Sequence, residues 1–330
     1  MRRGRRGALA GLLLGLALAS PARAEIAELR IGRQLGLGYL QLYVMQEQQL
    51  VEKHARAAGL ALRTRYLPLG SPAVLNEQLL SGNIELASAG PSPFVLLWDK
   101  TRGKARLVSA LGNQPILLNT NKPAIRTLTD FTDQDRIAVP GLKTSQHAIL
   151  LGLAAEKLYG KWDHFDPIQV SLAHPDAMAA LLSRKLEVTA HFATVPFQDQ
   201  ELERPGIHTV VSSFDITEGP SLTTAVWALD TFRTDNPKVY RAVLDAIAEA
   251  TAFIKANRAE AGRIFIRVDN SNLSPAFVDK ILANPNVQFS TEPTKLGLFA
   301  AYMHRTGLIK SQAGSWRDMV FPELAQGAGS

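Results

Sequence analysis

The stretch RIAVPGLKTSQHAILLGLAAEK (residues 136–157) decides how the fold of this chain is interpreted. RIAVPG is a short apolar run that predicts a strand, and the apolar periodicity from Ser145 to Tyr159 predicts a helix that stops at Gly160. A strand, a glycine turn and a helix start in this order are typical of an α/β unit. The free amide groups at the start of such a helix can hold an anion.

A nucleotide-binding loop is the first alternative for this stretch. Such a loop reads G-x-x-x-x-G-K-[ST], whereas here only Gly141 precedes Lys143 and Thr144, and the first glycine is absent. Two interpretations remain open. Thr144 or Ser145 is a plain helix cap, or both are ligand contacts at an anion site, with Lys143 as a solvated neighbour.

The segment SAGPSPF (residues 88–94) repeats this arrangement earlier in the chain. A predicted strand ends at Ser88, Gly90 permits a close approach of the backbone, and Ser92 lies where a helix begins. A well-formed helix start without a ligand is again the alternative. One such helix start in each half of the chain favours a single cleft that both of them face.

Short apolar runs alternate with helical patterns along most of the chain, and one helix is expected from Leu40 to Ala58. Beyond Asp230 the pattern is mainly helical. This alternation predicts two doubly wound α/β domains, each with a mostly parallel sheet covered on both faces. Crossings near 112–121 and 213–222 place residues 25–115 and 219–330 in domain 1 and residues 116–218 in domain 2. A two-crossing hinge of this kind puts a ligand cleft at the carboxyl ends of the strands. Strands are expected at residues 29–34, 61–69, 84–90, 105–112, 136–141, 168–173, 187–193, 207–213 and 222–229.

Residues 1–24 have the pattern of a secretory signal peptide, with four arginines ahead of an apolar run from Ala8 to Ala19 and small residues at Ala22 and Ala24. The apolar run is too short for a spanning helix, which needs roughly 20 residues. Cleavage after Ala24 removes five arginines and no acidic residue, so 31 basic residues face 30 acidic ones and the net charge becomes +1. A nucleic-acid partner is therefore not expected.

The chain contains no cysteine and seven histidines. Disulfides, thiol catalysis and thiolate metal sites are excluded on this ground. No two histidines have H-x-x-x-H or H-x-H spacing, and no G-x-S-x-G elbow occurs, so the sequence predicts neither a metal, a cofactor nor a hydrolase.

Three further segments offer candidate ligand contacts, each with a structural role as the alternative. GRQLGLGYLQ (residues 32–41) does not match the dinucleotide fingerprint and is interpreted as a ligand loop with donors at Gln34 and Tyr39. His191 ends the predicted strand EVTAHFA and is a candidate for the cleft. Glu218, near the second crossing, is a candidate partner for a cationic group on the ligand.

Three segments together carry a family resemblance: LASAGPSP (86–93), VPGLKTSQHAIL (139–150) and DAMAALLSRKLEVTAHF (176–192). Their order resembles the nitrate/sulfonate/taurine group of substrate-binding proteins of ABC transporters. The resemblance implies a type II periplasmic-binding fold, a hinge that closes on a small ligand, and delivery to a permease. The signal peptide predicts a periplasmic location, and a monomer with a small anionic ligand is expected. By position, the cleft loops of the group correspond to Gln34, Tyr39, Gly90, Ser92, Thr144, Ser145 and His191.

The chain departs from the group at two places. Members often have a tryptophan where this chain has Phe192, Ala193 and Thr194, and taurine binders have an acidic residue near the strand that reads LTTAVW here. Glu218 is the acidic residue near that strand. The alternatives are an enzyme of the same fold acting on a thiamin- or menaquinone-type precursor, and a binding protein that serves a sensor. The export signal argues against the enzyme.

Overall fold

The computed structural model describes residues 24–183 and 188–330. The predicted signal peptide lies outside the described residues, except for Ala24. No helix in the described ranges combines the length and the apolar character that crossing a membrane requires.

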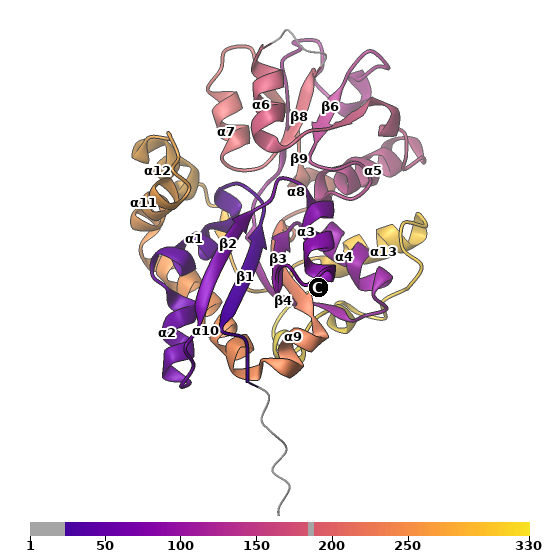
Figure 1. Cartoon of the computed structure of the whole chain (residues 1–330). Helices are drawn as coiled ribbons and strands as arrows, with labels where there is room; N and C mark the ends of the chain where they lie inside the picture. The colour runs from indigo at the N-terminus through magenta and orange to yellow at the C-terminus, as the bar shows by residue number, and fades with distance from the viewer. Residues whose placement is uncertain (1–23, 184–187) are drawn as a thin grey trace, which may run out of the picture.

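The strands form two sheets in two separate lobes (Figure 1). The order in the first sheet is β11-β4-β10-β3-β1-β2, and in the second it is β7-β6-β8-β5-β9. The chain crosses between the lobes after β4 and again before β10. The boundaries at 115/116 and 218/219 stay a prediction. The strands of the first lobe are β1 (Glu28–Arg33), β2 (Arg63–Pro68), β3 (Leu86–Ala89), β4 (Ala105–Asn113), β10 (Thr224–Leu229) and β11 (Gln288–Phe289), and those of the second lobe are β5 (Leu117–Thr120), β6 (Ile137–Val139), β7 (Gln169–Ser171), β8 (Ala190–Ala193) and β9 (His208–Ser212).

Both sheets are mixed, so the prediction of mostly parallel sheets is wrong. β1 pairs in parallel with β2 and β3, and β6 pairs in parallel with β7 and β8. By contrast, β10 runs antiparallel between β3 and β4, and β5 runs antiparallel between β8 and β9. The physical reason is that β5 and β10 enter their sheets directly from the other lobe, without the crossover helix that a parallel neighbour requires.

Helices cover both faces of the first sheet, as the apolar residues of its strands dictate. Along β4, Leu107 and Val108 belong to hydrophobic clusters on opposite faces, because successive side chains of a strand alternate. One face packs against α1 (Leu40–Glu47), α2 (Leu50–Ala57), α10 (Pro237–Ala256) and α11 (Arg258–Val268), and the other against α3 (Pro72–Leu80), α4 (Pro91–Lys100) and α13 (Leu296–Arg305). The remaining helices of this lobe are α9 (Asp230–Asp235), α12 (Pro275–Ala283) and α14 (Pro322–Ala325), and those of the second lobe and its crossing are α5 (Gln146–Tyr159), α6 (His174–Ser183), α7 (Phe197–Leu202) and α8 (Ser213–Ile216).

A single helix from Leu40 to Ala58 was expected, and this prediction is wrong. The helix is interrupted at Gln49, which has φ 48° and ψ 45° in the left-handed region. A residue in this conformation ends α1 and starts α2 in a new direction.

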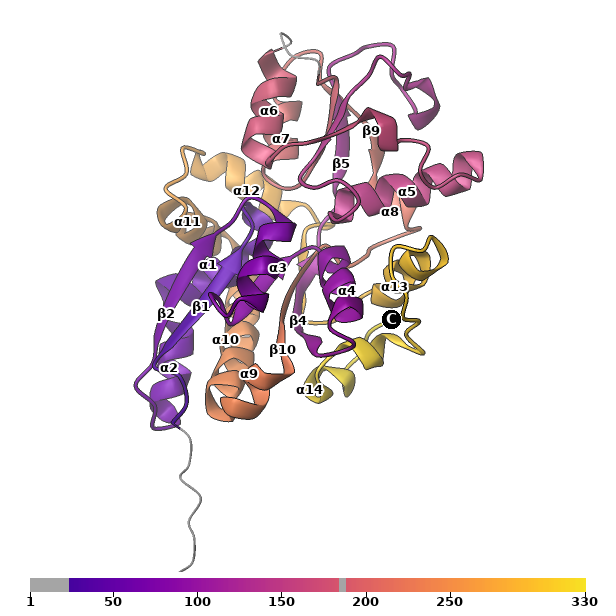
Figure 2. The ribbon, with the colours of Figure 1, turned by 45° about the vertical axis from the view of Figure 1, so that its right-hand side comes forward.

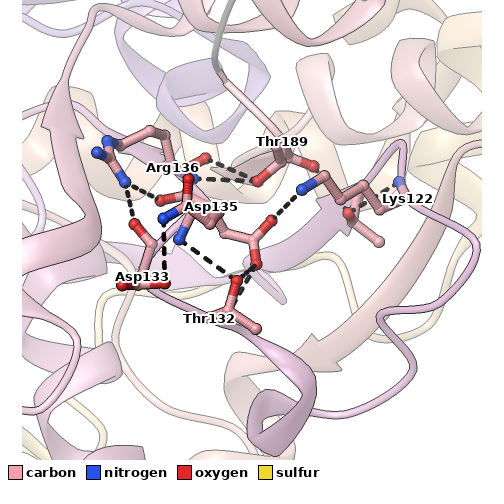
Figure 3. A network of polar contacts seen from close by, with 8 residues as sticks. Lys122, Thr132, Asp133, Asp135, Arg136 and Thr189 are labelled. Carbon is pink, nitrogen blue, oxygen red and sulfur yellow. Dashed lines mark hydrogen bonds and ion pairs between the residues drawn. The ribbon is translucent and has the colours of Figure 1, made fainter.

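β6 is anchored at its start by a polar network around the buried carboxylate of Asp135 (Figure 3). Lys122 donates from Nζ to Asp135 Oδ1 over 2.6 Å, and Thr132 donates its backbone amide and its hydroxyl to Oδ2 over 2.9 and 3.0 Å. The backbone amide of Arg136 donates to the hydroxyl of Thr189 over 3.1 Å, and Arg136 Nη1 donates to the carbonyl oxygen of Asp135 over 2.6 Å. The network fixes the turn that leads into β6 and therefore the position of the loop that follows it.

The two lobes contact each other directly. One hydrophobic cluster includes Leu75 and Phe94 of the first lobe together with Ile149 and Phe192 of the second. α4 and α13 of the first lobe both contact α5, which lies on the side of the second lobe that faces them (Figure 2). The conformation is therefore a closed one.

Candidate ligand-binding cleft

A small cleft lies between the two lobes. Its free space is about 10 Å³, close to the least volume that holds one water molecule. A ligand of several atoms therefore needs the lobes to separate or a side chain to turn. The cleft is lined by Gln34, Leu35, Tyr39, Pro72, Gly90, Pro93 and Thr223 on one side and by Ser145, Gln146, His147, His174 and Thr194 on the other.

Two helix N-termini, one from each lobe, meet at this cleft. α4 starts with Pro91 after Gly90, and α5 starts with Gln146 after Ser145. Ser145 is the N-cap of α5, because its hydroxyl accepts a hydrogen bond from the backbone amide of Ala148 over 3.2 Å. Both ends have the partial positive charge and the amide donors that favour an anion.

Gln146 connects the two helix starts. Its Oε1 accepts from the backbone amide of Ser92 over 3.2 Å and also from the hydroxyl of Ser92. Ser92 is fully buried at the first turn of α4. The amide oxygen of Gln146 thus occupies the donors that an oxygen of a bound anion would use, while its Nε2 is buried without a hydrogen-bond partner.

Three histidines and a glutamate form a buried group on the other side of the cleft. His174 Nδ1 lies 2.9 Å from His191 Nε2, and His191 Nδ1 lies 2.5 Å from Glu201 Oε1. The ring of His147 packs edge-on against His174 with 4.9 Å between centroids. Both ring nitrogens of His147 are buried without a partner, which is costly unless a ligand or water supplies one.

The histidines that line the cleft are neutral near pH 7. Burial, and then the neighbouring His191, lower the pKa of His147 to about 3. Burial also lowers the pKa of His174 well below its ordinary value, and His147 and His191 act in the same direction. A neutral imidazole offers one donor and one acceptor, so each ring can bind either a ligand oxygen or a ligand N–H group.

Most of the residues expected at the site lie at or next to this cleft. Gln34, Tyr39, Gly90 and Ser145 line it, and Ser92 lies directly behind the Gln146 amide. The Tyr39 hydroxyl donates to Gln34 Oε1 over 3.4 Å, so these two side chains are held together on the first lobe.

Three expected contacts do not lie in the cleft. The turn places Thr144 in a separate surface groove beside Pro72 and Leu308, because Lys143, at φ 56°, redirects the backbone just before the cap. His191 is fully buried behind His174. Glu218 is exposed and pairs with Lys157 Nζ over 2.6 Å, so it has a cationic partner within the chain.

Several functional candidates were missed from the sequence: Gln146, His147, His174, Thr194, Thr223 and Glu201. Gln146 and His147 follow Ser145 directly, so their place in the first turn of α5 was a usable signal. Glu201 lies on the short helix α7, for which the sequence has no long apolar period. Within residues 24–183 and 188–330, no group of acidic and histidine side chains is arranged to hold a metal ion.

Comparisons with known proteins concern the fold. A scan of protein-family models and a search of curated proteins find no match. Among solved structures, the alkanesulfonate-binding protein SsuA from Xanthomonas axonopodis pv. citri, bound to MOPS, matches with a TM-score of 0.71 at 19% identity, over 87% of this chain and 95% of that chain. The nitrate-binding protein NrtA from Synechocystis PCC 6803 matches with a TM-score of 0.70 at 14% identity, over 92% and 88%.

A third match carries the name of the fold. A protein from Candida albicans, described as having the generic periplasmic binding protein structural fold, matches with a TM-score of 0.64 at 14% identity, over 90% of this chain and 96% of that chain. The sulfonate- and nitrate-binding proteins named above are those of the group that the sequence resembles. The chain therefore has the periplasmic binding protein fold, as the sequence resemblance predicted.

Proposed function

We propose that this protein is an exported solute-binding protein that captures a small anion between its lobes and delivers it to an ABC permease. The observation that carries the proposal is the meeting of two helix N-termini from different lobes around an amide oxygen. Ser92 donates two hydrogen bonds there, and Gln146 Nε2 and His147 have unused hydrogen-bonding capacity. The fold and the named sulfonate- and nitrate-binding structures support the same ligand class.

The anion is bound by donors and not by a paired cation. An oxygen of the anion takes the place of Gln146 Oε1 at the start of α4, and the Gln146 amide group turns so that Nε2 donates to the ligand. Such charge-assisted hydrogen bonds offset the cost of burying the charge. Opening and closing of the lobes about the two crossings admits the ligand and forms the surface that the permease recognises.

A nitrate-like or sulfonate-like anion fits the cleft better than taurine does. None of the described residues that line the cleft has a carboxylate, and Glu218 is held by Lys157 on the surface. The ammonium group of taurine would therefore be buried without a counter-charge. The protein is proposed to act as a periplasmic monomer without a nucleic-acid partner.

An enzyme of the same fold is the second candidate. The observation that favours it is that Glu201 contacts His191, which in turn contacts His174 at the cleft. A carboxylate that orients an imidazole is typical of a general base. Product formation from a thiamin- or menaquinone-type precursor, followed by NMR, would favour the enzyme over the binding protein.

Replacement of Ser92 tests the site. Ser92→Ala removes one of the two donors at the start of α4, and we expect nitrate and ethanesulfonate to bind about 10- to 100-fold more weakly, since a hydrogen bond to a charged group is lost. Binding is measured by titration calorimetry on the chain from Glu25 onward.

The matched control is Ser274→Ala, which removes a serine from the N-terminus of α12, where its hydroxyl caps the helix by accepting from Phe277. We expect normal anion affinity for this variant. Equal affinities of the wild type and Ser92→Ala would mean that the anion does not bind at the start of α4. If the wild type binds neither anion, the proposed function is refuted.

A further inference from the structure

A continuous chain of side chains connects the cleft with the interior of the second lobe. Glu201 and His191 have no exposed surface, and His174 is only 7% exposed. The contacts run from Glu201 Oε1 to His191 and from His191 to His174 Nδ1. His174 lines the cleft, and its Nε2 has no hydrogen-bond partner among the described residues. The chain thus joins a buried carboxylate to a ring nitrogen at the ligand.

The hydrogen bonds allow two proton arrangements. As a carboxylate, Glu201 accepts from His191, so His191 has its hydrogen on Nδ1. Without a further proton, His191 Nε2 accepts from His174 Nδ1, and His174 Nε2 presents a lone pair to the cleft. With one more proton, His191 is an imidazolium that donates at both nitrogens, and His174 Nε2 presents an N–H group.

Only the second arrangement suits an anion. An anion is repelled by the lone pair and accepts a hydrogen bond from the N–H group. The extra proton also makes the group Glu201, His191 and His174 neutral overall, because the imidazolium offsets the carboxylate. Without it, the carboxylate and the anion would be two negative charges buried close together.

We propose that Glu201, His191 and His174 are positioning residues through which the cleft binds its anion together with one proton. The inference rests on the proposed function, because it takes a small anion as the ligand. The proton comes from solvent and binds to these side chains and not to the anion. One N–H bond forms at the pair His191 and His174, and no other bond changes.

The other titratable groups around the chain are few. His147 faces His174 from α5 and remains neutral at physiological pH. On α7, burial raises the pKa of Asp199 to about 6, with Lys280 acting in the opposite direction. Glu203 of the same helix pairs with Lys280 over 2.7 Å. Asp199 titrates in the physiological range, so its contribution has to be separated from that of Glu201.

Asn119 determines how the side chain of a Glu201→Gln variant is oriented. It donates from Nδ2 to Glu201 Oε2 over 2.9 Å, and in Glu201→Gln the same donor turns the new amide oxygen toward itself. The amide NH₂ group then faces His191 Nδ1 and donates to it. Neutral His191 now has its hydrogen on Nε2, and His174 presents an N–H group to the cleft without any added proton. Glu201→Gln should therefore bind the anion without taking up a proton.

The experiment is titration calorimetry with nitrate and with ethanesulfonate, in buffers of different ionisation enthalpy, between about pH 5 and about pH 8. We expect the wild type to take up about one proton per anion, with a Kd that rises as the pH rises, by about tenfold per pH unit where proton uptake is complete. Glu201→Gln should take up none and bind with a Kd that is independent of pH. The matched controls Glu203→Gln and Asp199→Asn should behave as the wild type does.

Each other outcome is decisive. Anion binding by the wild type without proton uptake overturns this inference alone, as does normal uptake by Glu201→Gln or its loss in Asp199→Asn. Absence of binding of both anions across the pH range overturns the proposed function and this inference with it. If thermal melting shows that Glu201→Gln does not fold, His174→Asn replaces it, because no ring nitrogen then reaches the cleft and proton uptake must be lost.

Discussion

Gly90 lies where the two lobes pack closely against each other beside the cleft. A Cβ atom at this position would lie 2.7 Å from Gln146 Cβ and 3.5 Å from the carbonyl oxygen of Thr223. The first distance is too short for two carbon atoms, and Gln146 Cβ belongs to the first turn of a helix. The glycine is therefore required by the closed arrangement of the lobes and not by its own backbone, whose φ is −65°.

Gly90→Ala should hold the lobes apart. The added methyl group strains only the closed state, so we expect about tenfold weaker binding of ethanesulfonate and a larger radius of gyration in small-angle scattering. Gly70→Ala is the matched control, because its Cβ would meet Ala173 of the other lobe at an ordinary 3.6 Å. An unchanged radius and affinity in Gly90→Ala would mean that Gln146 moves aside without separating the lobes.

Single residues of the site were predictable where they belong to a local motif. Gly90, Ser92 and Ser145 lie at helix starts, and a helix start has a clear signature of glycine, proline and serine. Glu201 and His174 were not found, because their role depends on contacts between α6, β8 and α7 that no local spacing reveals. Glu218 was expected to meet the ligand because of its place near a crossing, yet its partner Lys157 is 61 positions away in sequence.

At the scale of elements, the short strand β6 depends on the network shown in Figure 3. β6 has three residues and precedes the loop that leads into α5. Desolvation raises the pKa of Asp135, but the hydrogen bonds from Lys122 and Thr132 outweigh it, and the pKa of this carboxyl is lowered overall. The turn before β6 is therefore held by an ionised carboxylate.

Asp135→Asn should destabilise the protein by about 1–3 kcal/mol near pH 7, since a buried hydrogen-bonded charge is lost. A lowered pKa in the folded state stabilises the protein above the ordinary carboxyl pKa, and the stabilisation disappears as the pH falls through the folded pKa. In urea unfolding, the difference between the wild type and this variant should thus shrink from about pH 6 to about pH 3. The exposed Asp133→Asn is the control, and a difference that stays constant with pH would exclude an ionised Asp135 as the cause.

The sequence predicts most elements of the fold and misses those that depend on distant contacts. The predicted strand at residues 105–112 is β4 nearly to its ends, because a long apolar run in a buried strand is a strong local signal. The two-residue strand β11 exists only through its pairing with β4, and the break at Gln49 interrupts a pattern that otherwise suits one helix. The antiparallel entry of β5 and β10 is likewise decided by the path of the chain between the lobes.

At the scale of the whole molecule, a large hydrophobic cluster is shared by the two lobes. It runs from Leu75 and Phe94 in the first lobe to Ile149 and Phe192 in the second. In addition, a polar contact joins α13 and α5, where Arg305 donates from Nε to Glu156 over 3.0 Å. Neither lobe can unfold in this conformation without exposing apolar surface of the other.

We therefore expect one cooperative thermal transition although the molecule has two lobes. In scanning calorimetry the calorimetric and van't Hoff enthalpies should agree. Two resolved transitions would mean that the shared cluster contributes too little to couple the lobes. Tyr302→Phe on α13 is the control variant. It leaves the ring in place beside Gly152, so the single transition should be retained.

The contact between Gln146 and Ser92 has a consequence for the rate of ligand release. The donors of Ser92 lie in a buried site, where leaving them bare would add to the activation barrier for dissociation. Gln146 Oε1 is attached to the adjacent helix and can take each donor as the departing anion gives it up. On the proposed function, the side chain would therefore act as an internal displacing ligand, and ligand exchange would proceed by substitution instead of through an unsolvated intermediate. A binding protein that has to release its ligand quickly benefits from such a residue, because high affinity and fast dissociation are then compatible.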